Sequence, residues 1–273
     1  MAEQRDSQPV VVEANVQGVA TLTIHSKTMT PEFFEAFEAA MVALENNLEV
    51  RAVVIRAEDP KAFSYGLDLP KAFAKWGNIF QGGLVTERRK LHRVIKQLQR
   101  PLDLLFSLRV PTIAALHGHC IGGGLDLAAA CDLRLASSDL NLSLRETRIA
   151  IVADLGSLQR LPSIIGQGRT RELAFTGRDV SAAEALQMGL VNAVHTDKAA
   201  LDVAAQALAA TIAANAPRTV EGVKVVLNRA IEAEIRDGLD HVAAWNTAFL
   251  PSEDLGEAVA AFATRRAPQW KGR

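Results

Sequence analysis

Three consecutive glycines, Gly122, Gly123 and Gly124, lie where an apolar stretch typical of a strand gives way to a helical pattern. At such a junction the first backbone N–H groups of the helix lack partners, and the helix dipole places partial positive charge behind them. This arrangement predicts the binding of an anion, or the stabilisation of an oxygen that gains negative charge during a reaction. Taken alone, the triplet favours a plainer interpretation, a tight turn whose backbone angles require glycine.

A nucleotide-binding loop does not account for these glycines. Gly118 and Gly123 have the spacing of the P-loop glycines, but Gly124 follows where that motif requires lysine. A GxGxxG pattern begins at Gly166, and Arg171 stands in place of its third glycine. Neither phosphate-binding motif is complete.

Three acids follow the glycines at wide spacing, and carboxyl groups are common general acids and bases. Asp126 falls in the first turn of the predicted helix, where the dipole stabilises an acid. Glu146 lies between Arg145 and Arg148, a pattern typical of exposed ion pairs, which contribute little. Asp154 is compatible with an ordinary turn aspartate. Each acid by itself therefore favours a structural role.

The composition narrows the class of protein. The 273 residues are 49% hydrophobic with a mean hydropathy of +0.09, so the chain can bury one substantial core. Lysine and arginine number 30 against 31 acids, and aromatic residues are 5%, which argues against nucleic acid or an anionic membrane as the main partner. No apolar run reaches membrane-spanning length.

Cysteine usage and the two chain ends bear on location. Cys120 and Cys131 have neither the pairing of a secreted scaffold nor CxxC spacing, which indicates a reducing compartment. Glu3 and Asp6 make the N-terminus unlike a signal or transit peptide, and the C-terminal Lys-Gly-Arg is not an SKL-type peroxisomal address. We therefore expect a cytoplasmic protein.

The elements that position the glycines and acids follow an alternating pattern. Residues 9–24 predict two strands joined through Gly18 as a hairpin, and Thr30 with Pro31 predicts the cap and start of an amphipathic helix. The β-branched run 50–57 predicts a buried strand. Further along come a predicted basic helix (84–107), a strand (112–116), the glycine turn, a helix (125–131), a strand (133–136) and a short strand within LVNAVH (190–195), and the chain is mainly helical from about residue 162. This repeated winding predicts the α/β class.

Two ordered motifs carry a resemblance to a known family. HGHCIGGGLDLAAACDLRLA (117–136) and KAFSYGLDL (61–69) resemble the two signatures of the crotonase, or enoyl-CoA hydratase/isomerase, superfamily. Further likeness in 155–166, 173–194 and 252–268 extends the resemblance over roughly residues 10–268.

The resemblance implies a fold, a ligand and a binding site. It implies a core of repeated ββα units over 1–198, and a helical C-terminal region over 199–273 that mediates assembly into a homotrimer or homohexamer. It implies a CoA thioester that enters as substrate, so we expect neither a separate cofactor nor a metal. Two backbone amides, mapped to Tyr65 and Gly123, are implied to bind the thioester oxygen, and the Tyr65 phenol is expected to alter only the pocket's shape. The implied substrate-binding residues are Ala62, Phe63, Ser64, Gly66, Leu67, Asp68 and Gly122.

The acids point to one subgroup of that family. Hydratases carry a glutamate three residues after the oxyanion glycine and another twenty residues further on, where this chain has Asp126 and Glu146. Eight residues later hydratases usually have glycine, and this chain has Asp154, so the trio resembles the isomerases that convert 3,5-dienoyl-CoA to 2,4-dienoyl-CoA. That reaction removes a proton from C2 and adds one at C6, which requires one ionised and one protonated carboxyl group. We assign Glu146 to C2, Asp154 to C6 and a supporting role to Asp126, with the reverse C2/C6 assignment left open.

Other residues and other functions remain as alternatives. His117 and His119 flank the site, and we expect structural or pocket-lining roles for them. Trp245 and Phe262 are expected in the core or at trimer contacts. A solvated face, with some CoA phosphate contacts, is the interpretation of the basic residues Arg88, Arg89, Lys90, Arg93, Lys96 and Arg100. The competing functions are an enoyl-CoA hydratase, a non-catalytic acyl-CoA-binding paralogue and, without support from composition, an RNA-binding protein.

Overall fold

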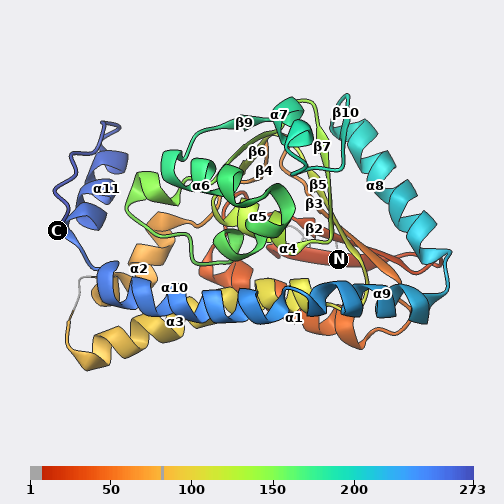
Figure 1. Ribbon diagram of the computed structural model, residues 1–273, viewed down its shortest axis with the longest axis horizontal. Coiled ribbons are helices and arrows are strands. Elements are labelled where there is room, and N and C mark those ends of the chain that lie inside the picture. Colours follow the sequence, from red (N-terminus) through yellow and green to blue (C-terminus); the bar gives the residue numbers. More distant parts are fainter. Residues whose placement is uncertain (1–7, 81–82) are drawn as a thin grey trace.

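Strands and helices alternate along the computed structural model, which describes residues 8–80 and 83–273 (Figure 1). Glu3 and Asp6 lie outside the described residues. The strands are β1 (Val10–Ala14), β2 (Val19–Ile24), β3 (Ala52–Ala57), β4 (Ala62–Ser64), β5 (Thr112–Leu116), β6 (His119–Ile121), β7 (Leu133–Ser137), β8 (Asn141–Ser143), β9 (Val180–Ser181) and β10 (Ala193–His195). The helices are α1 (Pro31–Asn46), α2 (Leu69–Phe80), α3 (Val85–Ser107), α4 (Gly123–Ala130), the 3₁₀ turn η1 (Glu146–Ile149), α5 (Ser157–Ile165), α6 (Gln167–Thr176), α7 (Ala182–Gln187), α8 (Lys198–Ala213), α9 (Pro217–Arg229), α10 (Glu232–Phe249) and α11 (Glu253–Ala263).

The strands form two sheets that the chain visits in turn. The larger sheet has the order β1-β2-β3-β5-β7-β10, and the smaller has the order β4-β6-β8-β9. Strands β3, β5 and β7 run parallel in the larger sheet, and each is followed by a short strand, β4, β6 or β8, in the smaller one. After β4 and β6, helices return the chain to the larger sheet, whereas after β8 they lead first to β9 of the smaller sheet. This pattern confirms the predicted α/β class with repeated ββα units.

Local sequence signals set most element boundaries. The β1–β2 hairpin turns at Gly18, whose φ is +80°, and the Thr30 side chain caps α1 by accepting the Phe33 N–H over 3.2 Å. The helix after the glycines begins at Gly123, two residues earlier than predicted, because Gly122 takes the turn with a φ of +54°. Gly123 and Gly124 therefore belong to the first turn of α4. The short strand β10 covers only the last half of the predicted segment.

Apolar packing holds helices on both faces of the larger sheet. The main core joins the two sheets to α1, α4 and the buried side of α3. On the opposite face, α8 packs Leu201, Ala205 and Ala209 against the strands. Helix α10 lies along α3, as Figure 1 shows, and both meet α11 in a third apolar cluster. The division of the chain at residue 198 into core and C-terminal region stays a prediction.

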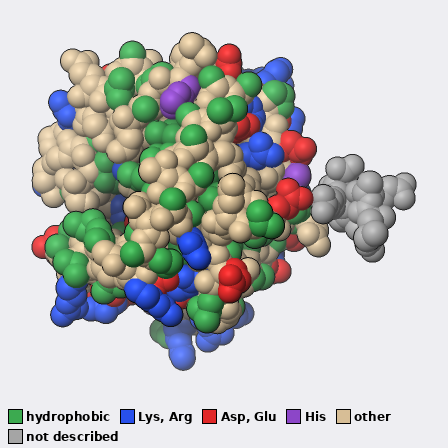
Figure 2. Space-filling model, turned by 90° about the vertical axis from the view of Figure 1, so that its right-hand side faces the viewer, with side chains coloured by type: hydrophobic (Ala, Val, Ile, Leu, Met, Phe, Trp, Pro, Cys, Tyr) green, Lys and Arg blue, Asp and Glu red, His purple; other side chains and the backbone are tan. Residues whose placement is uncertain are grey.

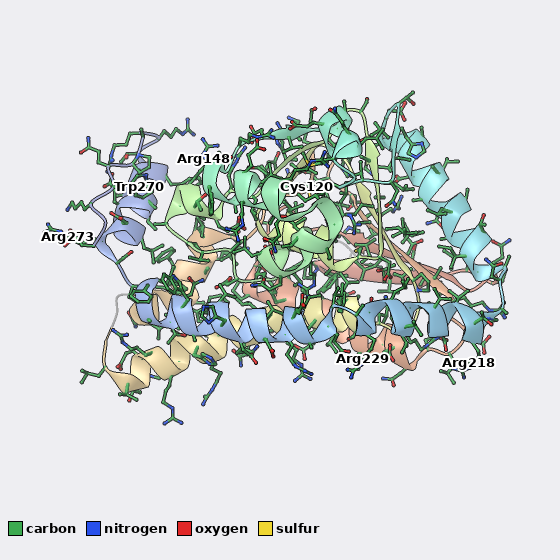
Figure 3. The ribbon with its side chains drawn as sticks, in the orientation of Figure 1. Cys120, Arg148, Arg218, Arg229, Trp270 and Arg273 are labelled. Atoms are coloured by element: carbon green, nitrogen blue, oxygen red, sulfur yellow. The ribbon has the colours of Figure 1, made fainter. Side chains whose placement is uncertain are left out.

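The mixed charges on the surface and the absence of a disulfide among the described residues agree with the balanced charge and the cysteine spacing of the sequence. On the face shown in Figure 2, basic and acidic side chains both occur among hydrophobic ones. Both cysteines are free and buried, and Cys120 lies in the interior in Figure 3. Within residues 8–80 and 83–273, no single helix is long and apolar enough to cross a membrane. Helices α8 and α9 taken together have the length and apolar composition of a membrane span, but the two are bent by 105° relative to each other.

Candidate active site

The glycine turn presents a backbone amide that lacks a partner. Gly122 donates its N–H to the Ser143 carbonyl over 3.0 Å, whereas the Gly123 N–H has no acceptor among the described residues. A Cβ at Gly123 would lie 2.8 Å from the Met29 sulfur, and one at Gly124 would lie 2.9 Å from the Ser64 Cβ. Glycine is needed at both positions because neighbouring segments approach the backbone closely.

The second amide predicted for this site belongs to a different residue. The Tyr65 N–H donates to the Lys27 carbonyl over 2.9 Å, so the prediction that it is free for a ligand was wrong. Met29 pairs with the backbone on both sides of Leu67, through the Gly66 carbonyl and the Asp68 N–H. Successive N–H groups of an extended chain point to opposite sides, so the Leu67 N–H points away from Met29. It has no acceptor in the described chain.

Gly66 brings the two unpartnered amides together. Its φ is +81°, and a Cβ there would lie 2.7 Å from the Ile121 carbonyl oxygen and 3.2 Å from the Gly123 nitrogen. The segment around Leu67 therefore touches the start of α4. Two N–H donors at a helix N-terminus form a preorganised site for an oxygen that carries negative charge.

A cavity of about 510 Å³ lies in front of these amides, and all three predicted acids reach it. Asp126 comes from α4, Glu146 from η1, and Asp154 from the loop before α5. A smaller apolar annex of about 60 Å³, between α2, α3 and α11, shares four lining residues with the main cavity: Leu67, Leu69, Ile151 and Asp154. The tertiary fold therefore places residues 28 positions apart in one site, with Asp154 at its apolar end.

The other predicted substrate-binding residues divide into two groups. The cavity wall includes Tyr65, Gly66, Leu67, Asp68 and Gly122, together with Gly123. Three residues of β4 are buried and do not border the cavity, so their contact with substrate stays a prediction: Ala62, Phe63 and Ser64. They are buried because β4 lies within the smaller sheet; Phe63 belongs to the main core, and the Ser64 Oγ accepts the Gly66 N–H over 3.1 Å.

Burial makes all three acids weaker than usual. Burial raises the pKa of Asp126 to about 6, although its Oδ1 accepts the Ser157 N–H over 2.6 Å, which opposes the rise. Burial, reinforced by the charges of Asp126 and Asp154, raises the pKa of Glu146 well above its ordinary range. Burial also raises the pKa of Asp154 to about 7, against a hydrogen bond from Asn246. Protonated and ionised carboxyl groups can therefore coexist near neutral pH.

The arginines beside Glu146 do not neutralise it. Arg145 pairs with Asp179, and the Arg148 guanidinium reaches the Gly177 carbonyl at 3.5 Å. One carboxylate oxygen of Glu146 is buried and has no hydrogen-bond partner in the described chain. Glu146 lines the cavity without an ion-pair partner, so the exposed ion pair expected from the sequence alone does not form.

Two residues of the C-terminal helices belong to the site and were missed. The Asn246 Nδ2 of α10 donates to the Asp154 Oδ2 over 2.8 Å. Phe262 of α11 lines the main cavity and is largely exposed, so it does not lie in the core of the chain, and its predicted trimer contact stays a prediction. A signal for Asn246 existed, since it continues the stripe of Leu239, Val242 and Ala243 with a polar residue. The sequence held no comparable signal for Phe262.

The two histidines are structural. His117 is buried, its Nε2 lies 2.6 Å from the Asp59 carbonyl oxygen, and burial lowers its pKa. The His119 ring lies 5.3 Å from the Tyr65 ring. Neither histidine lines the cavity that holds the acids. No cluster of three or more metal-binding side chains occurs among residues 8–80 and 83–273.

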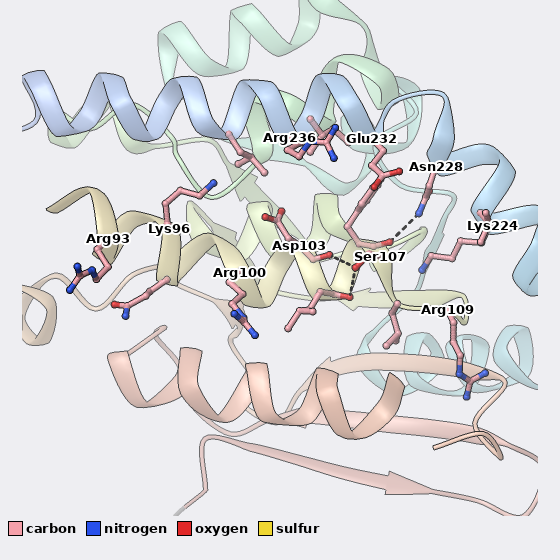
Figure 4. Close-up of a pocket in the computed structure, with 17 residues that line it drawn as sticks. Arg93, Lys96, Arg100, Asp103, Ser107, Arg109, Lys224, Asn228, Glu232 and Arg236 are labelled. Atoms are coloured by element: carbon pink, nitrogen blue, oxygen red, sulfur yellow. Dashed lines mark hydrogen bonds between the residues drawn. The ribbon is translucent and has the colours of Figure 1, made fainter. Parts of the chain in front are cut away.

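A larger cavity, of about 760 Å³, lies between α3 and the helices α9 and α10 (Figure 4). Arg93, Lys96 and Arg100 of the predicted basic face border it. Lys96 pairs with Asp240 and Arg100 with Glu38, each at 2.6 Å, so these charges are balanced within the chain. None of the three predicted acids and neither unpartnered amide borders this cavity. Size alone therefore does not identify the reactive site.

Comparison with known proteins places the chain in a family. Residues 14–273 match the enoyl-CoA hydratase/isomerase family. The chain belongs to this family. It is 41% identical over 249 residues to the peroxisomal Delta(3,5)-Delta(2,4)-dienoyl-CoA isomerase of Arabidopsis thaliana, an alignment that covers 90% of this chain and 88% of the relative. The mitochondrial isomerase of the same name from Dictyostelium discoideum is 39% identical over 244 residues, covering 89% of this chain and 83% of the relative.

A solved structure of similar sequence confirms the predicted crotonase-like fold. Carnitinyl-CoA hydratase from Mycobacterium avium is 30% identical to this chain and superposes with a TM-score of 0.81, covering 97% of this chain and 99% of that one. The two isomerases above are named as peroxisomal and mitochondrial proteins, which overturns the prediction of a cytoplasmic protein. Free buried cysteines indicate reducing conditions without telling one reducing compartment from another.

Proposed function

We propose that the chain is an enzyme that isomerises 3,5-dienoyl-CoA thioesters to 2,4-dienoyl-CoA thioesters. The observation that carries this proposal is the convergence of three weakened acids and two unpartnered amides on one cavity. The names of the relatives at 41% and 39% identity support it. CoA enters as part of the substrate, and no metal or separate cofactor has a step in the reaction.

The Leu67 and Gly123 amides form the oxyanion hole in this proposal. When a proton leaves C2, negative charge moves onto the thioester oxygen and gives an extended enolate. Donors that already point at this oxygen stabilise the enolate without reorganisation, by about 3 kcal/mol for a single donor. The N-terminus of α4 adds its partial positive charge at the same place.

The acyl chain is proposed to run from the amides toward the apolar annex. Glu146 lies close to the amides, since its Oε1 would be 3.0 Å from a Cβ at Gly122. Asp154 borders both the main cavity and the annex. This order supports the assignment of Glu146 to C2 and Asp154 to C6, with the remaining hydrocarbon in the annex. Asp126 of α4 accepts the Ser157 N–H and supports the pair through its charge.

The reaction uses one protonated and one ionised carboxyl group and leaves their protonation states exchanged, so the first must take up a proton from solvent and the second must release one before the next turnover. With Glu146 at C2, ionised Glu146 accepts the C2 proton and protonated Asp154 donates to C6. The electrostatics of the free site favour the reverse assignment, with Asp154 ionised and Glu146 protonated. Asp154 accepts a hydrogen bond from Asn246, whereas one oxygen of Glu146 has no partner in the described chain. Exchange of substrate C2–H with solvent deuterium decides between them: the variant that loses this exchange, Glu146→Gln or Asp154→Asn, identifies the group at C2.

An enoyl-CoA hydratase is the second candidate, favoured by the solved relative named as a hydratase. The test supplies purified protein with a 3,5-dienoyl-CoA and, separately, with a 2-enoyl-CoA, and follows conjugated-diene and enoyl absorbance. We expect rapid gain of the diene signal with little hydration, and loss of that gain in Asp154→Asn. Hydration alone refutes the isomerase proposal, and thioester binding without turnover indicates a non-catalytic paralogue. Asp237→Asn, an exposed change on α10, is the control.

We also propose that the chain assembles as a homotrimer or a homohexamer. Helix α9 supports this, because it leaves Val223, Val225, Val226 and Leu227 more than half exposed. Contiguous exposed apolar side chains mark surfaces that associate. Sedimentation velocity of the wild type and of Val226→Glu tests the proposal, and a wild-type monomer at micromolar concentration refutes it.

A further inference from the structure

Asn246 makes a pair of hydrogen bonds that joins α10 to the loop holding Asp154. Its Nδ2 donates to the Val152 carbonyl oxygen and to the Asp154 Oδ2, each over 2.8 Å. These two contacts match the two hydrogens of an amide nitrogen. Asn246 is 1% exposed, so water does not replace either contact.

The position of this amide is unusual for its helix. The neighbouring buried side chains of α10 are apolar, among them Leu239, Val242 and Ala243. A buried amide costs free energy unless it is fully hydrogen-bonded, and an aliphatic residue would suit the stripe better. A polar residue here therefore points to a role at the carboxyl group that it contacts.

Besides Asn246, the hydrogen bond to the Asp154 carboxyl group comes from the backbone N–H of Asp154 itself, and no other described side chain donates to it. Asp126 from α4 and Glu146 from η1 face it with like charge. The two arginines near the trio bond elsewhere: Arg145 pairs with Asp179, and Arg160 pairs with Asp103 at 2.7 Å. Around Asp154 in the annex, α2, α3, Ile151 and the residues around the start of α11 present apolar side chains. In the described chain Asn246 alone donates a side-chain hydrogen bond to the Asp154 carboxyl group.

We propose that Asn246 is a positioning residue for the reaction, which orients the Asp154 carboxyl group and stabilises its ionised form against two neighbouring acids. This inference rests on the isomerase function proposed above. If Asp154 is the acid, Asn246 stabilises the carboxylate that forms as the proton reaches C6. If Asp154 is the base, Asn246 keeps it ionised before substrate binds. In both cases the C-terminal helix contributes to proton transfer without touching substrate.

Gln99 of α3 provides a matched control. Its Nε2 also donates twice, to the Asp154 backbone carbonyl over 2.8 Å and to the Leu239 carbonyl over 3.1 Å. Gln99→Leu and Asn246→Leu each remove two buried hydrogen bonds at the same helix contact, and only Asn246→Leu removes one to the carboxylate. A purely structural role predicts similar behaviour for the two variants. Asn246→Ser is the milder second variant in case Asn246→Leu does not fold.

The test measures the Asp154 pKa directly, by carbon NMR of ¹³C-aspartate-labelled protein, and the pH profile of isomerisation. We expect Asn246→Leu to raise the pKa of Asp154 by about 1, since a hydrogen bond to a charged group is lost. One limb of the pH profile should move up equally: the alkaline limb if Asp154 is the acid, or the acidic limb if it is the base. The value of kcat should fall at least about tenfold, with KM changed less than kcat.

The outcomes separate the inference from the function on which it rests. An unchanged Asp154 pKa in Asn246→Leu or Asn246→Ser overturns the inference, and so does an equal shift in Gln99→Leu. The NMR titration needs no turnover, so it still tests the effect of Asn246 if the wild type fails to isomerise 3,5-dienoyl-CoA. That failure would refute the proposed function by itself.

Discussion

Replacing Asp154 by asparagine is expected to stabilise the fold at alkaline pH while it removes an acid that the proposed reaction needs. Burial raises the pKa of Asp154 in the folded chain from its ordinary 3.8 to about 7. A group whose folded pKa is raised favours folding when it is protonated. That contribution is complete below pH 3.8 and is lost as the pH rises through about 7. Asparagine carries no charge and escapes the loss.

The magnitude follows from the same two values. The rise from 3.8 to about 7 is about 3 units at about 1.4 kcal/mol each, so the ionised group costs about 4 kcal/mol above pH 8. At pH 4.5 the same two values give about 1 kcal/mol. These are upper limits, because Asp154 is only half-buried and one side of it faces the cavity. We expect a measured gain of about 2–4 kcal/mol at pH 8.5.

Urea unfolding of wild type and Asp154→Asn at pH 4.5 and pH 8.5 measures this effect. Ionic strength and protein concentration are held constant, because association makes stability depend on concentration. Asp237→Asn removes an acid from an exposed position of α10 and is the control. The reasoning is refuted if Asp154→Asn changes stability equally at both pH values, or destabilises the fold more at pH 8.5.

Three further predictions concern the cavity. Gly66→Ala should lower kcat at least about 100-fold, because a Cβ there would lie 2.7 Å from the Ile121 carbonyl oxygen and would displace the amide pair. Gly77→Ala is the control, since a Cβ at Gly77 has nothing within 4 Å. Equal kcat values for the two variants would contradict the placement of the amide pair. Phe262→Ala should raise KM several-fold and change kcat less, since the ring lines the cavity from α11; steady-state kinetics measure this, and an unchanged KM counts against it. Trp76→Ala should increase kcat/KM for longer acyl chains relative to short ones, because Trp76 lines the annex and a smaller side chain enlarges it. Competition between two dienoyl-CoA chain lengths measures the ratio, and a constant ratio rejects the annex as the acyl site.

Features that depend on neighbouring residues could be predicted from the sequence. Thr30 and Pro31 mark the start of α1, and Gly18 marks the hairpin, because caps and turns depend on side chains a few positions away. The α/β class followed from the alternation of strand and helix patterns. The glycine triplet and the acid trio identified the site through motif order and spacing, since the same chemistry requires the same residue types.

Errors arose where a residue's role depends on which way its backbone points. Tyr65 and Leu67 are two positions apart, and the motif alone did not tell which N–H is free. Pairing with Lys27 and Met29, segments from elsewhere in the chain, settles this. Ala62, Phe63 and Ser64 were predicted at the substrate because they belong to the same motif, and the smaller sheet buries them away from the cavity.

The sequence by itself determined the elements, the fold class, the family and the identity of the acids, because these depend on residue type and local spacing. Tertiary structure alone decided which amides are free, how strongly burial weakens each acid, and which distant helix completes the site. Asn246 and Phe262 reach Asp154 and the cavity from the last two helices only after the chain has folded. Hydrogen bonding and desolvation act over a few ångströms in space, whereas sequence patterns report only short distances along the chain.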